Sequence, residues 1–199
     1  MATFKAITAV SKAIISLLQV NYEQLAPETF SNPLQFNVYT AKDFSKPLTN
    51  GISLYLYRIF PGGSRRSPAG RTSTNGQKFQ TQLPLDLHFL LTVWANKASV
   101  QQSVAGWMMR VLEDTPILPF GLLEKEVPGA FRSNETVEIY LSDLSTDDLL
   151  HLWETLPVEN YQLSIPYFVR NIYIESEQLI PPTIPVQTRT FVYQKNEND

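Results

Sequence analysis

Cysteine is absent from the 199 residues, and histidine occurs only twice. Without cysteine there can be no disulfide, no thiolate nucleophile and no thiolate metal ligand. The sequence also lacks the run of roughly 20 apolar residues that a membrane-spanning helix requires. The apolar residues of the N-terminus are interrupted by Lys5, Ser11 and Lys12, so there is no continuous signal-peptide core. These absences predict a protein that is made and kept in the cytoplasm, or is exported by a route that the sequence does not show.

Enzyme motifs and excess charge are missing as well. The chain has no glycine-rich phosphate loop of the Walker type, no HExxH and no GxSxG. Its formal net charge is −3 at pH 7, so the chain as a whole is not attracted to nucleic acid or to an anionic membrane. We therefore expect no cofactor, no metal, no nucleic-acid partner and no membrane insertion.

What remains is an ordinary globular composition, with 43% hydrophobic and 18% charged residues. Apolar residues at helical spacing, with a capping-box-like start to the third helix, predict helices at residues 3–20, 98–113 and 145–156. β-branched and aromatic runs predict strands at residues 35–39, 51–60, 85–95, 136–141 and 167–174. The proline-containing stretch 115–133 should be irregular. Because helices interrupt the strands without regular alternation, we expect a single α+β domain with a mostly antiparallel or mixed sheet and about three helices packed on it.

Two tryptophans fall on the apolar stripes of the predicted helices. Trp107 lies in the second helix and Trp153 in the third. Aromatic residues at such positions are core residues more often than ligand contacts, so both are expected in the core.

A long loop should connect the two strongest strands. Residues 61–82 are rich in Gly, Ser and Thr and contain no acid, but four basic residues: Arg65, Arg66, Arg71 and Lys78. Such a loop should be mobile. It can be a solvated linker, a segment that binds phosphates of a nucleic acid, or a segment that becomes ordered on a protein partner. Phe79 is its only aromatic side chain, which disfavours single-strand nucleic-acid binding. We favour the protein partner.

An acid and an imidazole, Asp86 and His88, lie two residues apart in the predicted strand 85–95. On a strand they share one face, which suggests a catalytic or metal-binding pair. A metal needs three or four ligands, and the other histidine, His151, should face solvent opposite the apolar stripe of its helix. We therefore favour a structural role, with Asp86 and His88 hydrogen-bonded to each other or to nearby backbone at the edge of a sheet.

Five segments can be compared with known families: PLDLHFLLTVW (84–94), LYLYRIF (54–60), VAGWMMRVLEDTPIL (104–118), DDLLHLWETLPVENYQLSIPYFVRNIYIES (147–176) and PVQTRTFVY (185–193). They resemble segments of the cap, or tail-terminator, proteins of phage-tail-like contractile injection systems. They follow the family order over nearly the whole chain. The sequence departs from the family at Phe89, where the family has tyrosine, and at Gln162 and Leu163, where an arginine is often found. It ends at Asp199, without the additional C-terminal domain of some relatives.

The resemblance implies a structural role. Family members form a hexameric ring at the baseplate-distal end of the inner tube and sheath, end polymerisation and set the particle length, and they are not known as enzymes. The implied organisation is a cap domain at 1–178 and a C-terminal arm and polar tail at 179–199. The implied partners are five further copies of the chain and the sheath and inner-tube proteins. The fold-defining residues would be Asp86, His88, Trp107 and Trp153, and the candidate contact residues Arg65, Arg66, Arg71, Lys78, Arg189, Phe191 and Tyr193.

Two other functions fit some of these residues. The first is a small binding module that recognises nucleic acid or a peptide through loop 61–82, and the second is a hydrolase that depends on Asp86 and His88. The hydrolase lacks a nucleophile motif.

Overall fold

The computed structural model describes residues 2–25, 30, 33–62, 71–72 and 76–181. It is a single α+β domain built on one mixed sheet of six strands, in the order β1-β2-β5-β8-β7-β6. The strands are β1 (Gln35–Tyr39), β2 (Gly51–Pro61), β5 (Leu83–Trp94), β6 (Ile117–Leu118), β7 (Val137–Leu141) and β8 (Ser164–Ile174). β1 runs parallel to β2, and the other neighbours are antiparallel.

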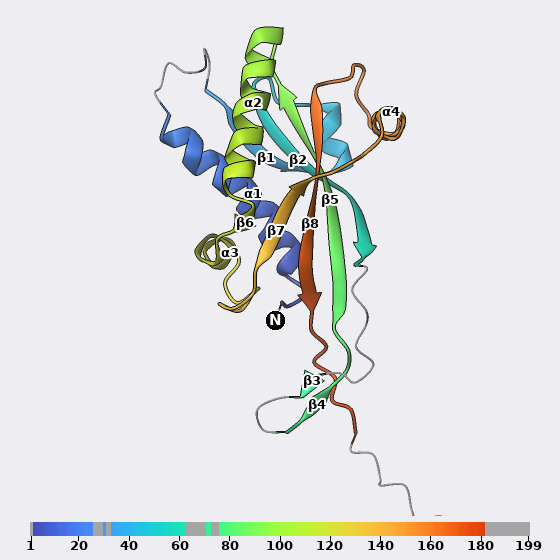
Figure 1. Cartoon of the computed structure of the whole chain (residues 1–199). Coiled ribbons are helices and arrows are strands. Elements are labelled where there is room, and N and C mark those ends of the chain that lie inside the picture. Colours follow the sequence, from blue (N-terminus) through green and yellow to red (C-terminus); the bar gives the residue numbers. More distant parts are fainter. Residues whose placement is uncertain (1, 26–29, 31–32, 63–70, 73–75, 182–199) are drawn as a thin grey trace, which may run out of the picture.

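Three helices cover one face of the sheet, which we call the inner face (Figure 1). They are α1 (Ala6–Glu23), α2 (Ala98–Asp114) and α3 (Phe120–Glu126). The alanines of α1, among them Ala6, Ala9 and Ala13, are fully buried, and their small side chains let the helix lie close to its neighbours. None of the helices in the described ranges is long and apolar enough to cross a membrane.

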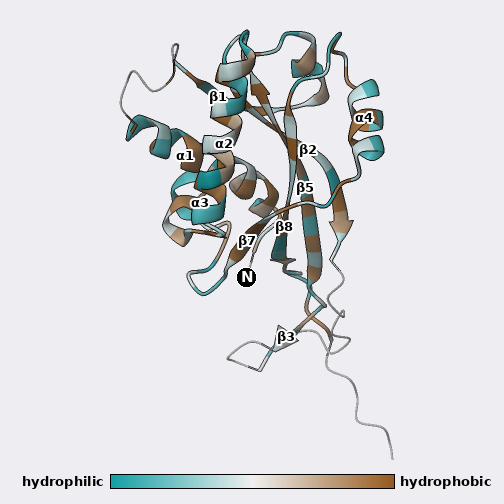
Figure 2. Cartoon of the chain, turned by 45° about the horizontal axis from the view of Figure 1, so that its top comes forward, coloured by the Kyte–Doolittle hydropathy of each residue, from teal (hydrophilic) through white to brown (hydrophobic). Residues whose placement is uncertain are grey.

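The opposite, outer face is covered only in part. The 3₁₀ helix η1 (Ala41–Ser45) and helix α4 (Thr146–Glu154) pack on it near the end of β5 that holds Trp94 (Figure 1). The side chain of Ser145 begins α4 by accepting a hydrogen bond from the backbone N–H of Asp148, as the capping pattern predicts. Figure 2 shows that the hydrophobic residues of α4 are interleaved with hydrophilic ones, as expected of a helix with one buried face.

Trp153 of α4 is central to the smaller core on the outer face. Its side chain is 5% exposed, and its ring lies 5.9 Å from Phe44, 6.4 Å from Trp94 and 5.3 Å from Tyr161. The expected burial of Trp153 is confirmed. Trp107 of α2 is only half-buried, and it contacts the rings of Tyr22, Phe30 and Phe36.

Most expected helices and strands are present, but the stretch 115–133 is not irregular. It contains β6 and α3, so the described residues form four α-helices, in agreement with the expected α+β domain with about three helices packed on its sheet. Pro119 precedes α3 with φ −61°, which suits a helix start, where the missing N–H is not needed. Pro116 still offers its carbonyl, which accepts a hydrogen bond from the Ile139 N–H (2.9 Å). Prolines were therefore compatible with regular structure at both places.

Loop 61–82 is also not entirely irregular. It contains β3 (Arg71–Thr72) and β4 (Lys78–Phe79), which pair antiparallel. β4 also pairs with a segment near the end of the chain: Phe79 forms a bridge with Leu179, Gln80 N–H donates to Gln178 O, and Ile180 N–H donates to Lys78 O. Partners so distant in the sequence cannot be inferred from the composition of the loop.

Candidate assembly surface

Beyond α4 and η1, no helix among the residues that the structure describes covers the outer face of the sheet. There, the register of four neighbouring strands aligns four side chains in one row: Arg58 of β2, His88 of β5, Phe168 of β8 and Tyr140 of β7. With two side chains from the adjacent row they form what we call the aromatic–arginine face: Arg58, Phe60, His88, Tyr140, Phe168 and Arg170. Arg58, Phe60, Tyr140 and Arg170 are exposed.

Ring stacking organises this face. The His88 and Phe168 rings lie 6.2 Å apart at 27°, and those of Tyr140 and Phe168 lie 5.5 Å apart at 27°. The Arg170 guanidinium lies 4.7 Å from the centre of the Tyr140 ring and 4.8 Å from that of Phe168. Cross-strand aromatic pairs stabilise such an arrangement by about 0.2–1 kcal/mol each, and exposed cation–π contacts by about 0.5–1 kcal/mol each. The side chains of the face are therefore held in defined positions.

The two arginines have no acidic partner within the described ranges of the chain. Arg58 stacks on Phe60, with 4.8 Å between the guanidinium and the ring centre, and Arg170 stacks on two rings as above. No ion pair joins either of them to another described residue. A guanidinium has five N–H donors, so both arginines can still bind carboxylates.

Two acids lie in the row beside the arginines. Asp86 is opposite Phe60 in the register, and Glu138 is opposite Arg170 and accepts a hydrogen bond from the Tyr140 hydroxyl. The face is therefore close to neutral in total, with separated charges of both signs.

Backbone irregularities shape the neighbourhood of Asp86. The register of β5 and β8 shifts beside it, where Asn171 adopts a positive φ of 66°. Such a bulge bends the strand and leaves an unpaired residue. A surface hollow of about 380 Å³ lies there, lined in part by Gly62, Asp86, Arg170 and Asn171.

Asp86 and His88 share the outer face, as the strand period predicts, while their neighbours Leu85, Leu87 and Phe89 are buried on the inner one. The expected edge position was wrong, because β5 is a central strand. No hydrogen bond joins the side chains of Asp86 and His88, and the alternative of a bond to nearby backbone stays a prediction. Burial lowers the pKa of His88, the charge of nearby Arg58 lowers it further, and Asp86 opposes both. The neutral form of His88 is therefore favoured at pH 7.

The other residues considered for a site differ in where the structure places them. No group of three His, Asp or Glu residues suited to a metal ion occurs in the part of the chain that the structure describes. His151 is exposed, as expected. Lys78 is exposed on β4, and the backbone of Arg71 lies in β3. Arg65, Arg66, Arg189, Phe191 and Tyr193 lie outside the described residues.

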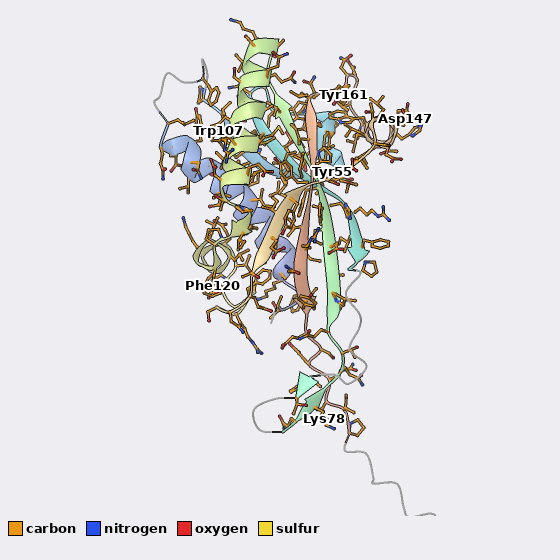
Figure 3. The ribbon with its side chains drawn as sticks, in the orientation of Figure 1. Tyr55, Lys78, Trp107, Phe120, Asp147 and Tyr161 are labelled. Carbon is orange, nitrogen blue, oxygen red and sulfur yellow. The ribbon has the colours of Figure 1, made fainter. Side chains whose placement is uncertain are left out.

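Lys78 belongs to a ribbon of β3, β4 and residues 178–180, which extends away from the sheet (Figures 1 and 3). The ribbon joins the two segments expected to make contacts, loop 61–82 and the arm that begins at residue 179. Leu179 is 52% exposed.

Sequence reasoning did not identify Arg58, Tyr140, Phe168 or Arg170 as members of a surface. A partial signal existed, because Arg58 and Phe60, and likewise Phe168 and Arg170, are two residues apart on predicted strands and must share a face. The row of four side chains can be recognised only when the order of the strands and their register are known.

Comparisons with known proteins agree with one another. The family model described as the Pvc16 N-terminal domain matches residues 9–188. No curated protein matches the sequence. Two solved structures share the fold: the sheath/tube terminator of an extracellular contractile injection system, PVC, in its extended state, and the tube-terminating cap of the anti-feeding prophage.

The likeness in fold covers nearly all of this chain. For the PVC terminator the TM-score is 0.57 at 17% identity, over 97% of this chain and 65% of the other. For the prophage cap the TM-score is 0.54 at 16% identity, over 92% of this chain and 60% of the other. The chain thus spans somewhat less than two thirds of the length of each terminator.

Proposed function

The chain belongs to the Pvc16 N-terminal domain family, the tail terminators of contractile injection systems, and we propose that it caps such a particle. In this proposal six copies form a ring at the baseplate-distal end of the inner tube and sheath. The ring ends polymerisation and fixes the length of the particle. The role is structural and involves no catalysed reaction, and assembly takes place in the cytoplasm.

The family match over residues 9–188 carries this proposal. It covers the sheet, the helices and the aromatic–arginine face. The common fold with a sheath/tube terminator and a tube-terminating cap supports the same role, since both of those proteins end a tube.

Ending a polymer poses a defined physical problem. Subunits joined by heterologous contacts add without limit, because each new subunit presents the surface that binds the next one. A cap must bind that last surface and offer no equivalent surface above it. A closed ring satisfies this requirement, because its own heterologous contacts are all used around the axis.

We further propose that the segments joined in the ribbon reach the tube and sheath. Loop 61–82 supplies Arg65, Arg66, Arg71 and Lys78, and the arm at 179–199 supplies Arg189, Phe191 and Tyr193. Basic and aromatic side chains are enriched in protein interfaces, and an extended segment can add strand hydrogen bonds to a partner.

Electron microscopy of particles from cells that lack this gene tests the function. We expect tubes and sheaths of variable, excessive length, and expression of the intact chain should restore a uniform length. In the complemented particles the chain should form a six-fold density at the end opposite the baseplate. Particles of normal length without the gene, or density for the chain elsewhere, would disprove the proposal.

A further inference from the structure

We propose that the aromatic–arginine face binds helix α4 of a neighbouring copy, and that this head-to-tail contact closes the ring. The inference rests on the proposed ring and assigns its subunit interface. One side of the contact is the part of the outer face that no described helix covers, and the other is the solvent-exposed side of α4.

The sheet side offers two guanidinium groups that no described acid pairs with directly. Arg58 and Arg170 are exposed, stack on aromatic rings and form no ion pair with a described residue. Stacking fixes the guanidinium planes while it leaves their N–H donors accessible. Arginine and aromatic residues together are typical of the residues that dominate binding energy at interfaces.

The helix side offers the complementary groups. Asp147, Leu150, His151 and Glu154 are spaced so that they share one side of α4, and all four are exposed. Figure 3 shows Asp147 on the side of α4 away from the sheet. Between Thr146 and Glu154 the helix has three acids and neither Lys nor Arg, and Leu150 is 44% exposed.

The distance between Arg58 and Arg170 on the sheet is similar to the distance between Asp147 and Glu154 on α4. Arg58 is in register with Phe168, two strands away, and Arg170 lies two residues further along the same strand. Strand geometry then separates the Cα atoms of the two arginines by roughly 12 Å. Asp147 and Glu154 are seven residues apart on a helix and therefore about 10 Å apart. Long arginine side chains can bridge the difference, and Leu150 would lie over the rings of His88 and Phe168.

Two acids beside the face, Asp86 and Glu138, favour a protein partner over a nucleic acid. Asp86 and Glu138 flank the arginines and would repel the continuous negative charge of a nucleic-acid backbone, whereas two isolated carboxylates that meet the two guanidinium groups experience less of that repulsion. A second copy is favoured because the same chain carries both complementary surfaces. Since the two surfaces differ, the contact is heterologous and can propagate around a ring.

Charge reversal on each side separately is the first test. Arg58→Glu/Arg170→Glu and Asp147→Lys/Glu154→Lys should each reduce capped ends about tenfold or more, counted by electron microscopy. Expressed together, the two variants should restore capping, because a ring of alternating copies again opposes unlike charges at all contacts. Lys12→Glu/Lys97→Glu alters exposed lysines elsewhere by the same net charge and should cap normally. Failure of co-expression to restore capping, with both variants folded, would overturn the proposal.

Cross-linking identifies the surfaces directly, because the chain has no native cysteine. In capped particles, Phe60→Cys/Leu150→Cys should give a ladder of species beyond the dimer with a short thiol-reactive cross-linker. Each single variant should give no dimer, and Lys12→Cys/Leu150→Cys serves as the control. Products that stop at the dimer would show a reciprocal two-fold contact instead, and cross-links to tube or sheath proteins would place the face against them; either result overturns the assignment.

The two proposals fail in distinguishable ways. A terminal six-fold ring without the expected cross-links would refute only the interface. Absence of the chain from the tube end would refute the function itself, whatever the cross-links show.

Discussion

Phe79 and Leu179 form an antiparallel bridge that joins two distant parts of the chain. Two hydrogen bonds complete the contact, from Gln80 N–H to Gln178 O (2.9 Å) and from Ile180 N–H to Lys78 O (2.8 Å). Through this bridge, the basic loop and the start of the C-terminal arm share one small ribbon. A ribbon this short is marginally stable by itself, so each segment should order the other.

Removal of one donor in the ribbon tests this coupling. Ile180→Pro eliminates the N–H that donates to Lys78 O, and we expect faster amide hydrogen exchange at residues 78–80. The melting temperature should stay within about 2 °C of the wild-type value, because the main sheet is not involved. Ile180→Ala keeps the N–H and serves as the control; equal exchange in both variants would contradict the prediction.

Trp153 should contribute strongly to stability. Trp153→Ala leaves a cavity between Phe44, Trp94 and Tyr161, and should lower the free energy of unfolding by about 3–5 kcal/mol. Urea titration measures this loss. Leu150→Ala, on the exposed side of the same helix, should cost less than about 0.5 kcal/mol. A Trp153→Ala variant with a wild-type midpoint would show that this core is dispensable.

A buried hydroxyl pair links two central strands. Thr92 Oγ1 and Ser164 Oγ lie 2.8 Å apart, and both residues are buried. Ser164→Ala should cost about 1–3 kcal/mol, since it leaves the Thr92 hydroxyl without this partner, and Thr92→Val should cost less, since Ser164 Oγ still donates to Gln162 O. The double variant should cost less than the two single costs combined, as measured in a double-mutant cycle. Additive costs would mean that the hydroxyls act independently.

His88 should make stability depend on pH. Its pKa in the folded protein lies below the ordinary 6.5, chiefly because burial disfavours the charged ring. The unfolded chain therefore binds the proton more readily, so the contribution of His88 is fully present above about pH 6.5 and is lost as the pH falls toward its folded pKa. His88→Gln should flatten this part of the curve of melting temperature against pH between about 5 and 7.5. An unchanged pH dependence in the variant would argue against it.

The loop arginines should matter for capping and not for folding. Replacing Arg65, Arg66 and Arg71 with serine should leave the melting temperature nearly unchanged, because these polar side chains are not expected in the core. Capping should weaken, and more so at high salt, where the remaining charge contacts are screened. The measurement is the length distribution of particles by electron microscopy; normal length and yield would make the loop a linker.

The local pattern of the sequence was sufficient to identify most elements and the family. The β-branched and aromatic residues of LPLDLHFLLTVW predicted a strand, and the two-residue period of a strand placed Asp86 and His88 on one face, because side-chain direction on a strand depends only on residue number. The Ser145 cap and the apolar stripe through Trp153 likewise predicted α4 and its burial. Helix α3 was missed because the prolines of the stretch 115–133 were interpreted as a sign of irregular structure, although a proline is compatible with the start of a helix.

Tertiary structure alone decided which of these pieces meet. That β5 is central, that Arg58, His88, Phe168 and Tyr140 form one row, and that Phe79 pairs with Leu179 all depend on strand order and register. These are contacts between residues distant in the chain, and their free energy comes from the packing of whole faces. Local propensity and spacing carry no information about which distant partner completes the pair.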